Sequence, residues 1–269
     1  MQKTDYSTSQ EQTAPIGLFS GKMGIALYHF HYARIYKDEI QEEKALTLIG
    51  EIQEEIHADT PYGYAEGLAG IGSALCYLFR EGFIKPDDED FFSDFDTFFF
   101  RKVYLGMHTD LSRATGLIGI GYYLLNRIKD TPIDDNMPSL QLRNLLLLVQ
   151  DVLFAYLGMN GYTYPFLEST SLPESVIVDV KRFLDQMLKT GICPELTRQA
   201  ITIMGDTRHL EQTVFAELED AYNNNNMQGF SDLLKKTAES TDLPEDSLAR
   251  LLANLQIQHM SLPAWWELF

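Results

Sequence analysis

Cysteine and long apolar runs are both scarce in this sequence, and each shortage excludes a class of protein. Only two cysteines are present, Cys76 and Cys193, which is too few for a disulfide framework and suits a reducing compartment. The apolar segment of a secretory signal is not visible near the N-terminus. Uncharged stretches such as 67–79 are too short to cross a bilayer. We therefore expect a cytoplasmic protein that does not enter the membrane.

Positive charge is also scarce. The chain has 21 lysines and arginines against 39 aspartates and glutamates, which gives a formal net charge of −18. An acidic surface repels phosphate groups, so we expect neither nucleic acid nor an anionic membrane as a partner. A basic peptide would be attracted, although solubility alone also explains such a charge. Nothing in the composition indicates the oligomeric state.

A glycine motif, Gly-x-x-Gly-Ile, occurs three times in the first half of the chain. Its glycines are Gly21 and Gly24, Gly67 and Gly70, and Gly116 and Gly119, so the copies begin 46 and 49 residues apart. This spacing suits one pair of helices per repeat. The stretch after each motif is apolar on nearly all sides, which predicts a buried inner helix. The next stretch is amphipathic, as in Ala45, Leu48 and Ile52, which predicts an outer helix.

The motif is lost beyond about residue 130, but helical patterns continue. Helices are predicted to begin at Pro173, at Pro194 and at Pro244, with another over 209–222. The helix from Pro173 has one apolar face, which includes Val180, Phe183, Leu184 and Met187, and is predicted to end at Gly191. No run alternates convincingly as a strand does. The sequence thus predicts an all-α fold, an α/α toroid-like ring of helical hairpins in which the second half need not close the ring.

The predicted domain organisation is simple. Residues 1–14 form a flexible tail, and 15–269 form a single α/α domain. Within that domain, 15–130 hold the clear repeats and 131–269 form a divergent helical part.

The motif glycines need a reason, because each costs about 1 kcal/mol relative to alanine inside a helix. Gly17, Gly21 and Gly24 would share one helical face, where the lack of side chains lets backbones approach closely. Near a helix start, glycine can instead leave amide groups free for a tight turn or a ligand. For most of these glycines we favour close packing at a crowded ring centre.

Three segments carry a resemblance to a known family. GLFSGKMGIAL, YAEGLAGIGSAL and DLSRATGLIGIGYYLLNRI resemble the N-terminal repeats of the lanthionine synthetase C-like (LanC-like) family. The resemblance covers residues 15–130 and is weaker as far as 205. It implies an α/α toroid. In active members, two cysteines and a histidine in Trp-Cys and Cys-His-Gly segments bind zinc, which activates a peptide cysteine to close a thioether ring.

The chain contains neither a Trp-Cys nor a Cys-His-Gly segment. The resemblance therefore implies a degenerate or non-catalytic member that binds a precursor peptide or a peptide-modifying enzyme, with no cofactor expected. An active zinc cyclase with atypical ligands is the alternative, and Cys193 with His209 or His108 would be its metal ligands. Cys76 falls within a predicted inner helix, where a buried structural cysteine is expected.

Polar residues just before the inner helices are the other candidates for chemistry. Tyr64 and Glu66 before the second inner helix, and His108, Asp110 and Arg113 before the third, would face a central cavity if the inner-helix starts line one. Glu66 and Asp110 would then supply the two carboxylates of a carbohydrate-active toroid enzyme. Asp110 and Ser112 can instead cap the following helix, which we favour. A scaffold that binds proteins unrelated to peptide modification remains open.

Overall fold

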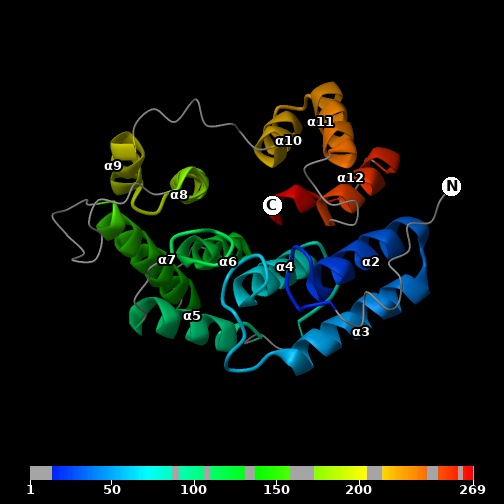
Figure 1. The fold of residues 1–269 in the computed structure, drawn as a ribbon, viewed down its shortest axis with the longest axis horizontal. Helices are drawn as coiled ribbons and strands as arrows, with labels where there is room; N and C mark the ends of the chain where they lie inside the picture. Colours follow the sequence, from blue (N-terminus) through cyan, green and yellow to red (C-terminus); the bar gives the residue numbers. More distant parts are fainter. Residues whose placement is uncertain are drawn as a thin grey trace. The chain divides into compact units, whose positions relative to one another are not determined.

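The structure is a computed structural model, and it describes residues 14–86, 91–105, 110–130, 137–157, 173–204, 214–240, 248–259 and 263–268. These residues form eleven α-helices and one short 3-10 helix, and no strand occurs among them (Figure 1). The all-α prediction is confirmed. The toroid-like ring stays a prediction, and the predicted tail lies outside the described residues except for Ala14.

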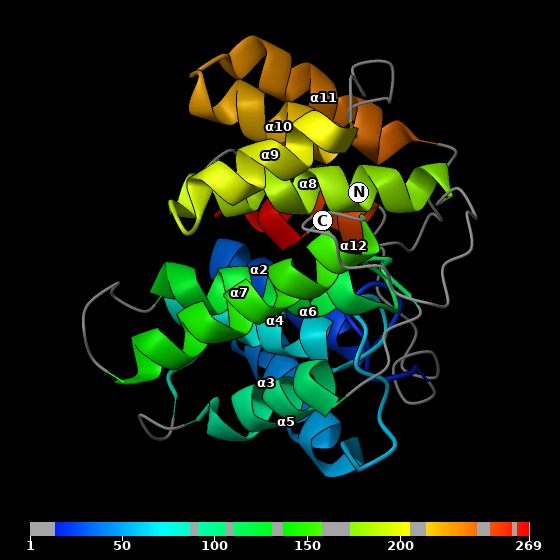
Figure 2. The same cartoon turned by 90° about the vertical axis from the view of Figure 1, so that its left-hand side faces the viewer.

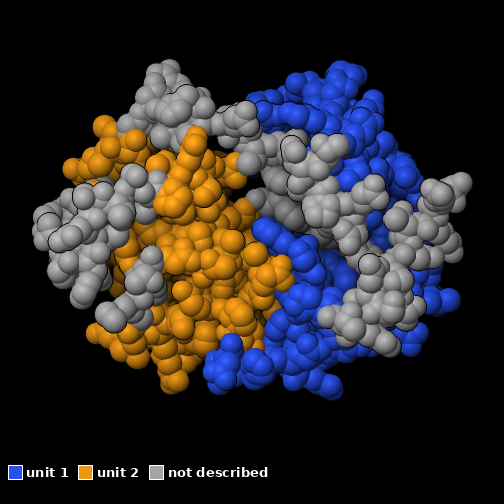
Figure 3. Space-filling model, in the orientation of Figure 1, with its two compact units in different colours: residues 1–59, 211–269 blue, residues 60–210 orange. Residues whose placement is uncertain are grey.

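The helices follow one another in the order α2 Lys22–Tyr36, α3 Glu39–Glu55, α4 Leu68–Arg80, α5 Ser93–Leu105, α6 Leu117–Asp130, α7 Met137–Tyr156, α8 Glu174–Thr190, α9 Pro194–Met204, α10 Val214–Asn223, α11 Met227–Glu239, α12 Leu248–Gln258 and the 3-10 helix η2 Trp265–Leu268. None of these described helices is long and apolar enough to cross a membrane. The sequence predicts one domain over 15–269, and the structure groups the chain into two compact units (Figure 3).

Unit 1 comprises residues 1–59 and 211–269, and its first hairpin is made of α2 and α3. Helix α2 is buried along most of its length, whereas α3 buries only a stripe that includes Ala45, Leu48 and Ile52. Asp38 caps α3, because its carboxylate accepts hydrogen bonds from the amides of Ile40 and Gln41. One largely buried helix and one helix with a single buried stripe match the pattern predicted for the first repeat.

The C-terminal helices belong to the same unit. Helix α11 packs against α10 and α12, and α12 packs against α2 (Figures 1 and 2). The hydroxyl of Tyr36 donates to Oε1 of Gln258 on α12 at 3.2 Å. Trp265 of η2 is fully buried, and its indole nitrogen donates to Gln256 at 3.2 Å. The chain's last described helices therefore share a core with its first.

Unit 2, residues 60–210, contains α4 to α9. Helix α6 is central in it, because α6 packs against α4, α7 and α8, while α5 packs against α7 and α8 against α9. Helix α8 buries one face, made of Val180, Phe183, Leu184 and Met187. It ends at Gly191, whose φ of 72° lies in the left-handed region that glycine adopts readily. The predicted face and end of this helix are confirmed.

Candidate functional site

The first glycine of each motif precedes its helix and is not part of it. Gly21 and Gly67 have extended backbones and are the N-cap residues of α2 and α4, and Gly116 directly precedes α6. The helical-face part of the prediction is therefore wrong for these three glycines, whereas the close packing against backbone that it expected is observed. The structure instead supports the alternative of a tight turn at the helix start.

The three turns share one hydrogen-bond pattern. The amide after the glycine donates to the carbonyl six residues before the glycine, as in Lys22 to Pro15 at 2.7 Å, Leu68 to Pro61 at 2.9 Å and Leu117 to Asp110 at 3.0 Å. A Cβ atom on Gly21, Gly67 or Gly116 would lie well under 3.0 Å from that carbonyl oxygen. Glycine is needed because the carbonyl lies too close to leave room for a side chain. The closed loop in turn supplies a hydrogen-bond acceptor to an amide at the helix start, which has no partner within the helix.

The second and third loops lie against each other in unit 2. The amide of Ala65 donates to the carbonyl of Ala114 at 3.0 Å. A Cβ atom on Gly63 would collide with that carbonyl, and one on Gly119 would lie 3.0 Å from the amide nitrogen of Tyr64. Consecutive repeats therefore meet through their loops at backbone distance, and the residues of loops 61–67 and 110–116 are brought together.

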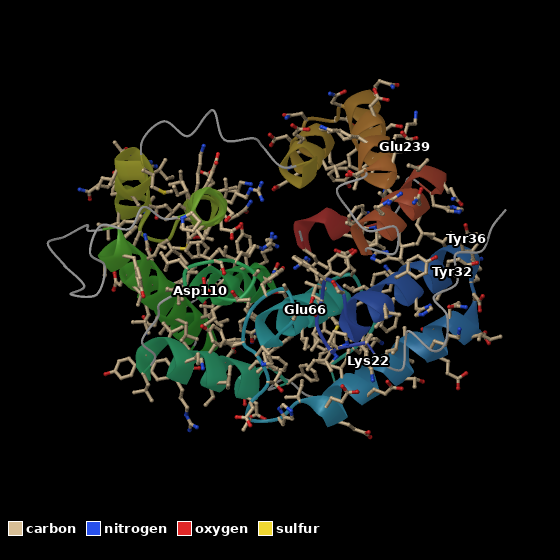
Figure 4. The ribbon with its side chains drawn as sticks, viewed as in Figure 1. Lys22, Tyr32, Tyr36, Glu66, Asp110 and Glu239 are labelled. Carbon is tan, nitrogen blue, oxygen red and sulfur yellow. The ribbon has the colours of Figure 1, made fainter. Side chains whose placement is uncertain are left out.

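Two predicted carboxylates, Glu66 and Asp110, come from these neighbouring loops (Figure 4). The carboxylate of Asp110 accepts hydrogen bonds from the amide of Ser112 at 2.7 Å and from the hydroxyl of Thr115 at 2.5 Å. Burial alone would raise its pKa, but these hydrogen bonds hold the pKa of Asp110 below its usual value. Asp110 is therefore a charged hydrogen-bond acceptor that closes the loop. A general acid must instead hold a proton that it can donate. Glu66 is half-buried and directly precedes the Gly67 cap.

The predicted metal candidates are only partly described. His108 and His209 lie outside the described residues. Cys193 is half-buried, precedes α9 with a φ of 45°, and its carbonyl accepts the amide of Thr197. Cys76 is buried within α4, as predicted. No group of three metal-binding side chains occurs within the part of the chain that the structure describes.

An arginine cluster joins the two loops to α6 and α8. The guanidinium of Arg113 lies over the ring of Tyr64, 4.4 Å from its centroid, and over that of Tyr122, 4.3 Å from its centroid. These two rings meet edge to face at 5.8 Å. The amide of Arg113 donates to Oδ2 of Asp179 on α8 at 2.8 Å, so one residue contacts three elements of unit 2. Arg113 is 8% exposed.

Arg182 stands one turn after Asp179 on α8 and completes this arginine cluster. Its Nη2 atom is buried and has no hydrogen-bond partner among the described residues. Burial lowers the pKa of Arg182, and the positive charge of Arg113 acts in the same direction, whereas Tyr122 and Asp179 oppose it. Burial likewise raises the pKa of Tyr122 to about 12. Two arginines and two tyrosines therefore gather, with Asp179, in a largely buried cluster.

Sequence reasoning placed Tyr64 and Arg113 near a helix start but missed Tyr122, Asp179 and Arg182. Asp179 and Arg182 lie three residues apart on an amphipathic helix that carries several other charged residues, and that spacing is the only local signal they carry. The contact between Arg113 and α8 spans 66 residues of sequence, so no local pattern encodes it.

The described residues define an all-α protein in which polar and aromatic side chains from loops 61–67 and 110–116 meet those of α6 and α8. Comparison with protein-family models, with curated proteins and with solved structures finds no match in any of the three.

Proposed function

We propose that the chain is a peptide- or partner-binding module of the LanC-like type that lacks the zinc-dependent ring-forming activity. Its resemblance to that family rests on the three glycine motifs, whose loops all close in the same way. The arginine cluster of unit 2 is the observation that carries the binding role. Arginine and tyrosine are enriched in protein interfaces, where they combine a large contact area with hydrogen bonding.

A non-catalytic role agrees with what Asp110 does. Its carboxylate is already used by Ser112 and Thr115, so a two-carboxylate hydrolysis with Glu66 would need a proton donor that this arrangement does not provide. Cys193 has a backbone role at the start of α9, where its carbonyl accepts the hydroxyl of Thr197 at 3.1 Å as well as the amide. We expect no zinc in the purified protein.

The test combines binding, chemistry and metal content on the full chain. A panel of C-terminally amidated peptides containing cysteine and dehydroalanine is titrated against the protein by fluorescence anisotropy. Ring closure leaves the peptide mass unchanged, so free thiols in the same mixtures are alkylated before mass spectrometry, and a peptide that resists alkylation has formed its thioether. Elemental analysis measures zinc in protein purified without a chelator or a metal-affinity tag. We expect peptide binding with no ring closure and no stoichiometric zinc.

Two matched variants test whether peptide binding depends on the arginine cluster. Tyr122→Leu should weaken peptide binding, because the ring beside Arg113 is lost. Tyr104→Leu changes an exposed tyrosine on α5 and should leave binding intact. Ring closure together with bound zinc would establish the cyclase alternative. A panel without a single binder would reject the peptide-binding module.

A further inference from the structure

The environment of Arg182 suggests that its side chain binds a group of a ligand and not another group of the protein. Arg113 is held by the rings of Tyr64 and Tyr122, whereas the Nη2 atom of Arg182 is buried without a hydrogen bond to any described residue. Buried polar groups in folded proteins are nearly always paired, and a charged donor without a partner is especially costly. The buried Nη2 donor of Arg182 therefore indicates a hydrogen-bond partner that is not one of the described residues.

The charges around Arg182 favour an anion as that partner. Arg113 and Arg182 bring two positive charges close enough for each to influence the other. Asp179 lies on the same face of α8, but its Oδ2 atom already accepts the backbone amide of Arg113. The site therefore suits an anion of low charge, although the whole chain is strongly acidic.

We propose that Arg182, with Arg113 and Tyr122 beside it, binds a carboxylate group of the peptide ligand. The planar fork of a guanidinium matches the two oxygens of a carboxylate, and hydrogen bonds between charged partners are the strong ones. A phosphate dianion would bring more negative charge toward Asp179 and is disfavoured. The ring of Tyr122, which is not fully buried and packs against the core residue Phe183 at 6.3 Å, suits the apolar part of a peptide next to its carboxylate.

This inference rests on the proposed peptide-binding function but has its own probe. Acetyl-trialanine with a free C-terminal carboxylate is titrated against the full chain by calorimetry, in parallel with the same peptide as its amide and with sodium acetate at constant ionic strength. We expect the acid to bind at least about tenfold more tightly than the amide, the effect of one good ionic contact. Weaker binding of acetate would show that the peptide part contributes.

Variants of Arg182 make the assignment specific. Arg182→Gln should remove the preference for the acid over the amide, and Arg182→Lys should retain part of it because the charge stays while the fork is lost. Arg198→Gln is the matched control, since Arg198 is an exposed arginine of the same unit paired with Glu195. Circular dichroism confirms that each variant keeps its helices.

The outcomes separate this inference from the function on which it rests. Equal affinity for acid and amide, or an acid preference that survives Arg182→Gln, would overturn the carboxylate site even if the amidated panel peptides bind. Failure of the acid to bind at all would also overturn it. Conversely, an acid preference that depends on Arg182, together with no binding of any panel peptide, would support the carboxylate site and reject the broader peptide-binding role.

Discussion

The Nζ atom of Lys22 lies 2.6 Å from Oε2 of Glu51, which places the first side chain of α2 in an ion pair with α3. Glu55, one turn further along α3, lies 2.5 Å from the same nitrogen. The side chain of Lys22 is 5% exposed, whereas those of the two glutamates remain substantially in solvent. In the second and third repeats, Leu68 and Leu117 occupy the corresponding position. The first hairpin therefore uses a buried cation where the others use an apolar side chain.

Replacing Lys22 should cost less than removing its partners. Lys22→Leu restores the residue type of the other repeats and leaves two solvated glutamates, so the free energy of unfolding should stay within about 1 kcal/mol of the wild type. The double change Glu51→Gln and Glu55→Gln leaves a buried ammonium with weaker acceptors and should cost about 1–3 kcal/mol. Urea unfolding measures both.

The control for this comparison is Glu54→Gln, which removes an exposed carboxylate from the same helix and should have an effect within about 0.5 kcal/mol. Burial alone would lower the pKa of Lys22, but its hydrogen bonds to Glu51 and Glu55 raise that pKa above the usual value. The ion pair is therefore complete at neutral pH, and on the alkaline side it is lost as pH rises through the raised pKa of Lys22. A larger loss for Lys22→Leu than for the double change would contradict this account.

The first motif glycine should tolerate no side chain. Gly21→Ala places a Cβ atom against the carbonyl of Pro15. This carbonyl accepts the hydrogen bond that closes the loop, so it cannot move away without breaking that bond. The substitution should therefore lower the free energy of unfolding by about 1–3 kcal/mol. Gly50→Ala is the matched control in the same unit, because no atom lies within 4 Å of its added Cβ. Gly50 lies inside α3, so alanine there should stabilise by up to about 1 kcal/mol.

Gly67→Ala and Gly116→Ala should repeat the loss in unit 2, where the carbonyls of Pro61 and Asp110 stand in the same place. Chemical unfolding followed by circular dichroism measures all four variants. A Gly21→Ala protein as stable as the Gly50→Ala protein would show that the loop can open without cost, and the shared loop geometry would lose its structural role.

The helices could be predicted from the sequence because their signals are local. Alternating buried and exposed positions along α3 and α8, and the left-handed stop at Gly191, depend on residues within a few turns of one another. The role of Gly21 could not be read in this way, because its reason is a carbonyl contributed by Pro15 across a closed loop. Helical periodicity placed Gly21 inside the helix, whereas the loop places it just outside.

The candidate site was predictable only in part for the same physical reason. Tyr64 and Arg113 could be found because they stand near a repeated motif. Arg113 contacts Tyr122 and Asp179, and the positions of these two residues depend on the packing of α6 against α8. Such packing depends on tertiary shape, which one sequence does not express as a pattern.

Asp110 should stabilise its loop only while it is charged. Its folded-state pKa lies below the usual value near 3.8, so its contribution is present above that value and is lost as pH falls through the lower folded-state pKa. Asp110→Asn should therefore cost about 1–2 kcal/mol at neutral pH and progressively less in acid, since the bonds from Ser112 and Thr115 go to a charged acceptor. Urea unfolding across this pH range measures the difference.

The control for Asp110 is Asp151→Asn, which changes an exposed carboxylate on α7 in the same unit and should alter stability by no more than about 0.5 kcal/mol at any pH. A cost for Asp110→Asn that stays constant as the pH falls would mean that the charge of the carboxylate does not matter. The loop would then be held by its backbone hydrogen bonds alone.

His31 should make unit 1 sensitive to acid. This side chain is fully buried in α2, and burial, with a smaller effect of the positive charge of Arg34, lowers its pKa to about 3 from 6.5. The unfolded chain therefore binds a proton at His31 between these two pH values while the folded chain does not. The free energy of unfolding should fall as the pH drops from 6.5 toward 3, by at most about 1.4 kcal/mol per pH unit.

Two variants and one direct measurement test this contribution. His31→Gln and His31→Phe cannot take up the proton, so both should flatten the pH dependence by the same amount even if their stabilities at neutral pH differ. Proton resonances of the imidazole ring, assigned by the loss of a signal in His31→Gln, report the titration in the folded state. A resonance that titrates near pH 6.5 would show that the buried imidazole accepts a proton without unfolding, and α2 would then tolerate a charge where we expect none.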